Sequence, residues 1–130
     1  MITIKKKEHL VALSKALRAL KFECDEDTVF IFAGSPHIAE IQRQLHSTLL
    51  KESNPNLSTE EIQQIHIDDY DFKKREHLFT KVKGYLEKTS TWNLFSLAIK
   101  KEYISNLVSP YFIDESFLME LIEETDAFHS

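Results

Sequence analysis

The sequence is poor in the residues that restrict a chain to particular protein classes. Its single cysteine, Cys24, excludes an intrachain disulfide framework and favours a reducing compartment. Two glycines and three prolines are few for a sandwich or barrel with many tight turns, and favour a helix-rich domain. No apolar run approaches the ~18 residues of a membrane span. The start, MITIKKKEHL, has no apolar segment after its lysines, so we expect no secretory signal and a cytoplasmic protein.

The sequence also lacks the local motifs that identify a reaction. It contains no G-x-S-x-G nucleophile elbow, no H-E-x-x-H zinc motif and no glycine-rich phosphate loop. Cys24 or Ser35 could in principle pair with one of the six histidines, but no local signature surrounds either residue. We therefore expect no cofactor, and the pattern favours a protein that is not an enzyme.

Core-forming residues, in contrast, are plentiful. Of the 130 residues 42% are apolar, and they include nine Phe, four Tyr and one Trp, which argues against disorder. A chain of this length buries roughly two-thirds of its unfolded surface. We expect a single globular domain over residues 1–130, without internal repeats.

One stretch predicts a small sheet. The run VFIFA at residues 29–33 is rich in β-branched and aromatic residues, which is typical of a buried strand. With residues 22–24 it would form a hairpin around the acidic turn at 25–28. Residues 1–4 alternate weakly and predict a short edge strand. The predicted fold class is therefore α+β, with five or six helices packed around a small antiparallel hairpin.

Apolar residues at helical spacing predict the helices. Ser35 is a suitable N-cap and Pro36 suits a first helical position, while Asp114 and either Ser58 or Thr59 cap later helices. Residues 51–57 (KESNPNL) predict a loop. The helices are expected at residues 5–20, 36–50, from about 59, 72–86, 92–108 and from about 115. The helix at 92–108 is the most apolar, so we expect it to be central.

Acidic residues are concentrated in blocks, although the net charge is only -5. From residue 102 onwards the chain has seven acids and no Lys or Arg. Acids near a helix C-terminus oppose the helix macrodipole, and a local rule broken in this way often marks a functional surface. The predicted partner-binding residues are Glu120, Glu123, Glu124 and Asp126 in the last helix, with Glu23, Asp25, Glu26 and Asp27 in the acidic turn.

This charge pattern favours a non-enzymatic protein that binds a basic partner. Small acidic inhibitors of basic toxins, such as the immunity proteins that protect bacteria from their own nuclease toxins, have a similar size and charge. The analogy rests on composition alone. We expect an inhibitor or immunity-type protein that neutralises a basic, toxin-like protein.

Two alternatives remain open. The Gly34–Pro36 turn places a helix N-terminus after an apolar run, and with His37 and the acids of residues 68–77 it could form an anion site of a small enzyme or ligand-binding domain. A face of Lys74, Lys81 and Lys88 could bind nucleic acid. The net negative charge favours a solvated face, or one that meets the acidic tail of the protein itself.

Potential metal ligands are densest around residue 70. They are His66, Asp68, Asp69, Asp71 and His77. Their spacing fits no defined site, and a calcium loop that starts at Asp69 would have Lys74 where glycine is required. We expect no bound metal, and acids that partly cap the following helix.

Overall fold

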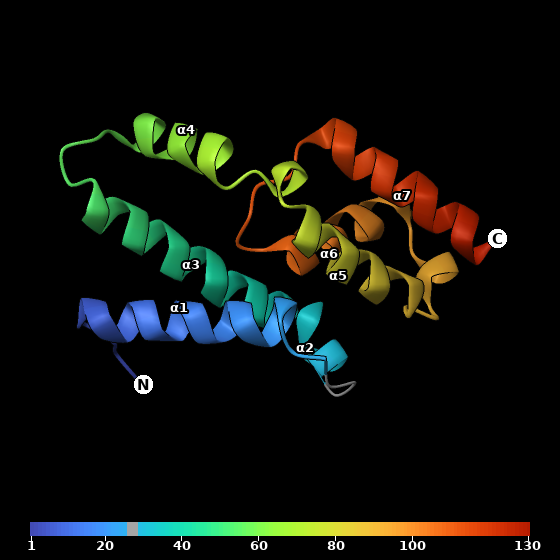
Figure 1. Ribbon diagram of the computed structural model, residues 1–130, viewed down its shortest axis with the longest axis horizontal. Coiled ribbons are helices and arrows are strands. Elements are labelled where there is room, and N and C mark those ends of the chain that lie inside the picture. Colours follow the sequence, from blue (N-terminus) through green and yellow to red (C-terminus); the bar gives the residue numbers. More distant parts are fainter. Residues whose placement is uncertain (26–28) are drawn as a thin grey trace.

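The computed structural model describes residues 1–25 and 29–130 and is an elongated assembly of short helices (Figure 1). In chain order the elements are α1 (Lys7–Phe22), α2 (Phe30–Ala33), α3 (Pro36–Ser53), α4 (Thr59–Asp69), the 3-10 helix η2 (Phe72–Lys74), α5 (Glu76–Glu87), the 3-10 helix η3 (Trp92–Leu94), α6 (Leu97–Val108) and α7 (Glu115–His129). None of the helices in these two ranges is long and apolar enough to cross a membrane.

The predicted α+β class is wrong, because the described residues contain no strand and the fold is all-helical. The run at 29–33 leads into the single turn of α2, where Ala33 is buried but Ile31 is 74% exposed. So short an apolar run cannot be assigned to strand or helix by periodicity alone. Phe22 is the last residue of α1 rather than part of a hairpin, and residues 1–4 are exposed and irregular. The turn residues 26–28 lie outside the described residues.

Several predicted helix starts are confirmed by their caps. The Ser35 hydroxyl accepts a hydrogen bond from the Ile38 N–H at 3.3 Å, with Pro36 at the first helical position. Ser58 and Glu61 form a reciprocal capping box at the start of α4. Such caps satisfy N–H groups that have no partner within the helix, so the local sequence suffices to specify them.

Both of the longer helices predicted in the second half are interrupted. Residues 72–86 divide into η2 and α5, because Asp71 caps a tight turn and Arg75 leaves the helical conformation. Residues 92–108 divide into η3 and α6, because Phe95 is extended and Ser96 caps a new helix. Both parts reach the core, through Trp92 in η3 and Ile104 in α6, but Leu94 at the end of η3 is 84% exposed.

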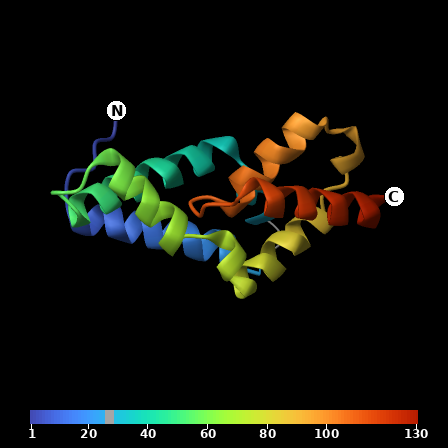
Figure 2. The same cartoon turned by 90° about the horizontal axis from the view of Figure 1, so that it is seen from above.

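The helices form two groups along the long axis. In Figures 1 and 2 α1, α3 and α4 lie at one end, and α5, α6 and α7 lie at the other. The main apolar core belongs mostly to the second group, and Phe22 of α1 and Ala33 of α2 also contribute to it. Its largest fully buried side chains are Trp92, Phe72, Leu86, Ile104, Leu107 and Leu121.

Candidate functional site

Helix α7 keeps three of its four predicted partner-binding acids on its outer surface. Glu120 and Glu123 are exposed and form no ion pair with a described residue. Glu124 lies 3.9 Å from the Lys83 ammonium of α5, a long contact between two side chains that are each about half exposed. The cation therefore neutralises little of this acidic surface.

Asp126, the fourth acid, is engaged inside the molecule. Its carboxylate accepts hydrogen bonds from the Lys100 ammonium at 2.7 Å and from the Trp92 indole N–H at 2.8 Å. The hydrogen bond from Lys100, followed by that from Trp92, lowers the pKa of the Asp126 carboxyl below its ordinary value against the opposing effect of burial. An acid close to the C-terminus of α7 is thus compensated by tertiary contacts that the sequence does not reveal.

A groove of about 420 Å³ lies between α5 and α7 beside the exposed acids. Glu120, Glu124 and Phe128 are spaced four residues apart and therefore share one face of α7. Phe128 is 57% exposed, whereas its neighbour His129 stacks on Trp92 with ring centroids 6.3 Å apart. The lining residues are Lys83, Glu87, Leu121, Glu124, Thr125, Ala127 and Phe128.

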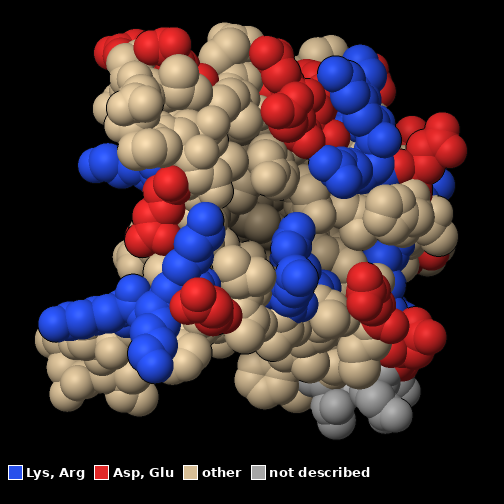
Figure 3. Space-filling model, turned by 60° about the vertical axis from the view of Figure 1, so that its left-hand side comes forward, with Lys and Arg blue, Asp and Glu red and all other residues tan. Residues whose placement is uncertain are grey.

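The acidic turn is only partly described, and its described part is bound to a lysine of α5. The Lys81 ammonium lies 3.0 Å from the Asp25 carboxylate and 2.7 Å from the Cys24 carbonyl oxygen. Glu23 is exposed, and Glu26 and Asp27 lie outside the described residues. On the face shown in Figure 3 acidic and basic side chains are interspersed around a central hollow, so charges that are segregated in sequence are mixed in space.

The three lysines of the nucleic-acid alternative do not share one helix. Lys74 ends η2, Lys81 lies in α5, and Lys88 is the residue that caps the end of α5. Since Lys81 is held by Cys24 and Asp25, its ammonium is already occupied within the protein.

The Gly34–Pro36 turn is occupied by packing and capping. A Cβ on Gly34 would overlap the ring of Tyr103, whose hydroxyl lies 2.8 Å from the Thr89 hydroxyl. The groove beside this turn has no lining residue from 68–77, and His37 does not line it. The structure therefore does not bring together the residues of the ligand-binding alternative.

The potential metal ligands around residue 70 are also separated. Within the described ranges no three His, Cys, Asp or Glu side chains are placed to hold a metal ion. Asp68 accepts a hydrogen bond from Gln64, and Asp71 caps η2. His66 contacts another histidine, His46. That the stretch holds no metal stays a prediction.

A buried ammonium group joins the two groups of helices, and the sequence analysis missed it. Lys21 is 2% exposed, and its Nζ donates to Gln42 Oε1 at 2.8 Å and to the carbonyls of Asn106 at 2.6 Å and Ser109 at 2.9 Å. Burial, and secondly the charge of Arg43, lowers the Lys21 pKa from 10.5 to about 7. A signal was present: Lys21 continues the apolar stripe of α1 four residues after Leu17.

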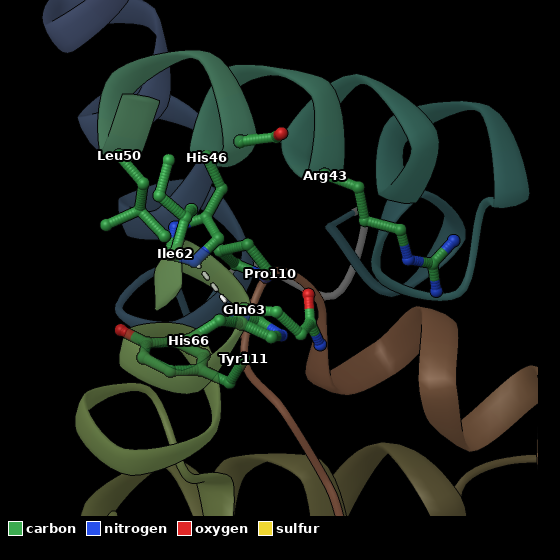
Figure 4. A pocket seen from close by; sticks show the side chains of 9 residues that line it. Arg43, His46, Leu50, Ile62, Gln63, His66, Pro110 and Tyr111 are labelled. Carbon is green, nitrogen blue, oxygen red and sulfur yellow. Dashed lines mark hydrogen bonds between the residues drawn. The ribbon is translucent and has the colours of Figure 1, made fainter. Parts of the chain in front are cut away.

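A second missed feature is a pair of histidines in a cavity of about 220 Å³ between α3, α4 and the segment after α6 (Figure 4). His46 Nε2 and His66 Nδ1 are 2.9 Å apart. Burial lowers the pKa of both imidazoles, and for His46, where the charges of His66 and Arg18 add to burial, the pKa falls from 6.5 to about 4. The two residues are twenty positions apart on different helices, and no sequence motif links them.

Comparison with known proteins adds no relative: no family model, no curated protein and no solved structure matches the chain.

Proposed function

We propose that this protein is a non-enzymatic binding domain that engages a basic protein partner through the outer face of α7 and the groove between α5 and α7. The observation that carries the proposal is the alignment of exposed acids with an exposed aromatic side chain on one face of α7. The small size and the net negative charge of the protein favour an inhibitor or immunity-type role against a basic, toxin-like partner. We assign the contact to Glu120, Glu123, Glu124 and Phe128.

The partner segment should carry cations next to an apolar side chain, because the exposed acids of α7 all precede Phe128 along the helix. Aromatic residues such as Phe128 are frequent anchors of protein interfaces when they become buried, and the surrounding groove offers apolar surface from Leu121 and Ala127. The acids of α7 would accelerate association with a cationic surface and select against acidic proteins. Asp126 and Asp25 are already paired with lysines, so we leave them outside the contact surface.

The test compares two triple variants that change the net charge equally. One replaces Glu120, Glu123 and Glu124 by Gln. The other replaces Glu8, Glu52 and Glu60, which are exposed acids elsewhere, by Gln. A partner captured from the host lysate by the unaltered protein is purified, and its association and dissociation rates with each variant are measured at low and high salt.

We expect the α7 triple variant to lose affinity by about 1–3 kcal/mol, mainly through slower and less salt-dependent association. The matched triple variant should bind almost as the unaltered protein does. Phe128→Ala should instead accelerate dissociation. A partner whose affinity is indifferent to the α7 charges, to Phe128 and to salt contradicts the proposed surface.

A further inference from the structure

We propose a second and separate binding site: the cavity between α3 and α4 takes a small molecule that carries an oxyanion, a carboxylate or a phosphate, on a compact apolar body. This site is lined mainly by α3 and α4, with Pro110 and Tyr111 from the segment after α6, whereas the groove beside α7 is lined by α5 and α7 at the other end of the molecule (Figure 1). It is therefore independent of the proposed protein interface.

The charge of the cavity is the first reason. The cavity of about 220 Å³ adjoins a smaller one of about 110 Å³, since His46, Leu50 and Pro110 line both. Arg43 lines the larger cavity and Arg18 the smaller, and no described Asp or Glu lines either. In a chain with 21 acids and 16 bases, a concave region with cations and no carboxylate selects for an anion.

Unused hydrogen-bond donors are the second reason. The Arg18 Nε atom is buried and has no hydrogen-bond partner among the described residues. Arg43 is engaged differently: its guanidinium donates to Asn106 Oδ1 of α6 at 3.0 Å, so Arg43 contributes positive charge at the border of the cavity and Arg18 contributes the free donor. A guanidinium fork matches the geometry of a carboxylate or phosphate, and a buried donor without a partner destabilises the empty site.

The histidine pair is the third reason. His46 and His66 hydrogen-bond to each other at 2.9 Å, and Arg18 of α1 lines the adjoining cavity together with His46. In Figure 4 the Arg43 guanidinium is directed away from this pair. Because the lowered pKa values keep both imidazoles uncharged at neutral pH, the pair can accept a proton when an anion arrives. Binding should therefore be coupled to proton uptake and strengthen as the pH falls.

The shape of the cavity defines the rest of the ligand. Leu50, Ile62 and Pro110 supply apolar wall, and in Figure 4 the Gln63 side chain lies at the cavity from α4. The volume is below the roughly 300–1,000 Å³ of sites for drug-sized ligands, so the occupant is a small metabolite. We infer a single oxyanion at the polar end and a short hydrocarbon or ring against the apolar wall.

The test uses three probes: phenyl phosphate, benzoate and inorganic phosphate. Binding is followed by calorimetry and by the NMR signals of the His46 and His66 rings. The decisive variant is Gln63→Glu, which places a carboxylate at the cavity without changing the size of the side chain. Its matched control is Gln64→Glu, the same change one residue later on α4 at an exposed residue that does not line the cavity.

We expect saturable one-to-one binding of phenyl phosphate or benzoate, with an upward pKa shift of the two histidines. Gln63→Glu should weaken it at least about ten-fold, because a like charge then faces the anion, and Gln64→Glu should change it less than about two-fold. Stronger binding of phenyl phosphate than of benzoate identifies a phosphate ligand, and the reverse identifies a carboxylate. Comparable binding of inorganic phosphate shows that the apolar body contributes little, which contradicts that part of the proposal.

Three results overturn the site as a whole. The first is the absence of saturable binding of all three probes up to about 10 mM, which corresponds to less than roughly 3 kcal/mol of affinity. The second is binding that Gln63→Glu and Gln64→Glu affect equally. The third is tight binding of Zn²⁺ by the histidine pair without binding of any anion, which would make the pair a metal ligand set instead.

Discussion

Replacing Lys21 by methionine should destabilise the protein, and by an amount that increases with pH. Lys21 donates three hydrogen bonds inside the protein, two of them to carbonyls at the end of α6. In a continuing helix the Asn106 carbonyl would accept from the N–H of residue 110, but residue 110 is proline and has none. The Lys21 ammonium supplies the missing donor. Its removal therefore leaves the buried carbonyls of Asn106 and Ser109 without this hydrogen bond.

The expected loss follows from these contacts. A buried carbonyl left without a partner costs about 1–3 kcal/mol, so two of them cost about 2–6 kcal/mol. Part of this loss is offset, because methionine fills much of the volume of the lysine stem and carries no charge to desolvate. We expect Lys21→Met to lower the free energy of unfolding by about 2–4 kcal/mol at pH 7, a large share of the roughly 5–15 kcal/mol of a typical domain.

The pH dependence gives the sharper measurement. In the folded protein the Lys21 pKa is lowered to about 7, whereas the unfolded chain keeps this proton up to its ordinary pKa of 10.5. Between these two pKa values the unfolded state binds more protons, so the free energy of unfolding rises with pH. Well below pH 7 Lys21 is protonated in both states, and its contribution no longer depends on pH. From pH 7 to pH 9 the unaltered protein should gain about 2 kcal/mol relative to Lys21→Met.

The assay is urea denaturation of both proteins at pH 6, 7, 8 and 9, with the difference in unfolding free energy plotted against pH. Lys15→Met, at an exposed position of the same helix, is the matched control and should show neither the loss nor the slope. Gln42→Glu should abolish the rise with pH, because a carboxylate beside the ammonium raises its pKa. A difference that stays flat or declines from pH 7 to pH 9 refutes this account of Lys21.

Three further predictions concern other positions. Acidification from pH 6.5 to about 4 should lower stability by at most about 3 kcal/mol through His46, because the unfolded chain takes up a proton that the folded imidazole with its lowered pKa does not. In thermal denaturation His46→Gln should remove this part of the decline. An acid profile that His46→Gln leaves unchanged contradicts this prediction. Gly34→Ala should destabilise by about 1–3 kcal/mol, because its Cβ would displace the Tyr103 ring, and a neutral result in urea denaturation would mean that the ring has room to move. Asp126→Asn should lower stability by roughly 1 kcal/mol, because the carboxylate is partly exposed and loses its ion pair with Lys100, and calorimetry showing no loss would mark the pair as dispensable.

Local chemistry accounts for the parts of the fold that could be predicted from sequence. Ser35, Ser58 and Asp114 begin helices because each side chain accepts a hydrogen bond from an N–H only three residues ahead. The apolar stripes of the helices likewise depend on neighbours in sequence. Contacts that reach no further than one helical turn are encoded in a window of a few residues.

The errors arose where distant contacts decide between local alternatives. The run at 29–33 has strand-like composition, yet no strand in the described residues pairs with it, and Phe30 instead packs against Tyr85. A strand needs a partner to satisfy its backbone hydrogen bonds, whereas a helical turn satisfies them within itself. Similarly, the helix expected at 92–108 breaks at Phe95, and Trp92 before the break contacts α7, where it donates to Asp126 and stacks on His129.

The candidate sites likewise combine features set by the local sequence and features set by distant contacts. The sequence by itself determined the acidic, exposed character of Glu120, Glu123 and Glu124, since charged residues opposite an apolar stripe remain in water. Only the tertiary structure decided that Asp126 is paired with Lys100, that Lys21 caps α6, and that His46 meets His66 in a cavity. Each of these contacts joins residues 20 to 85 positions apart, and whether a charged or titratable side chain is buried depends on which helices pack together, information that no local window of sequence contains.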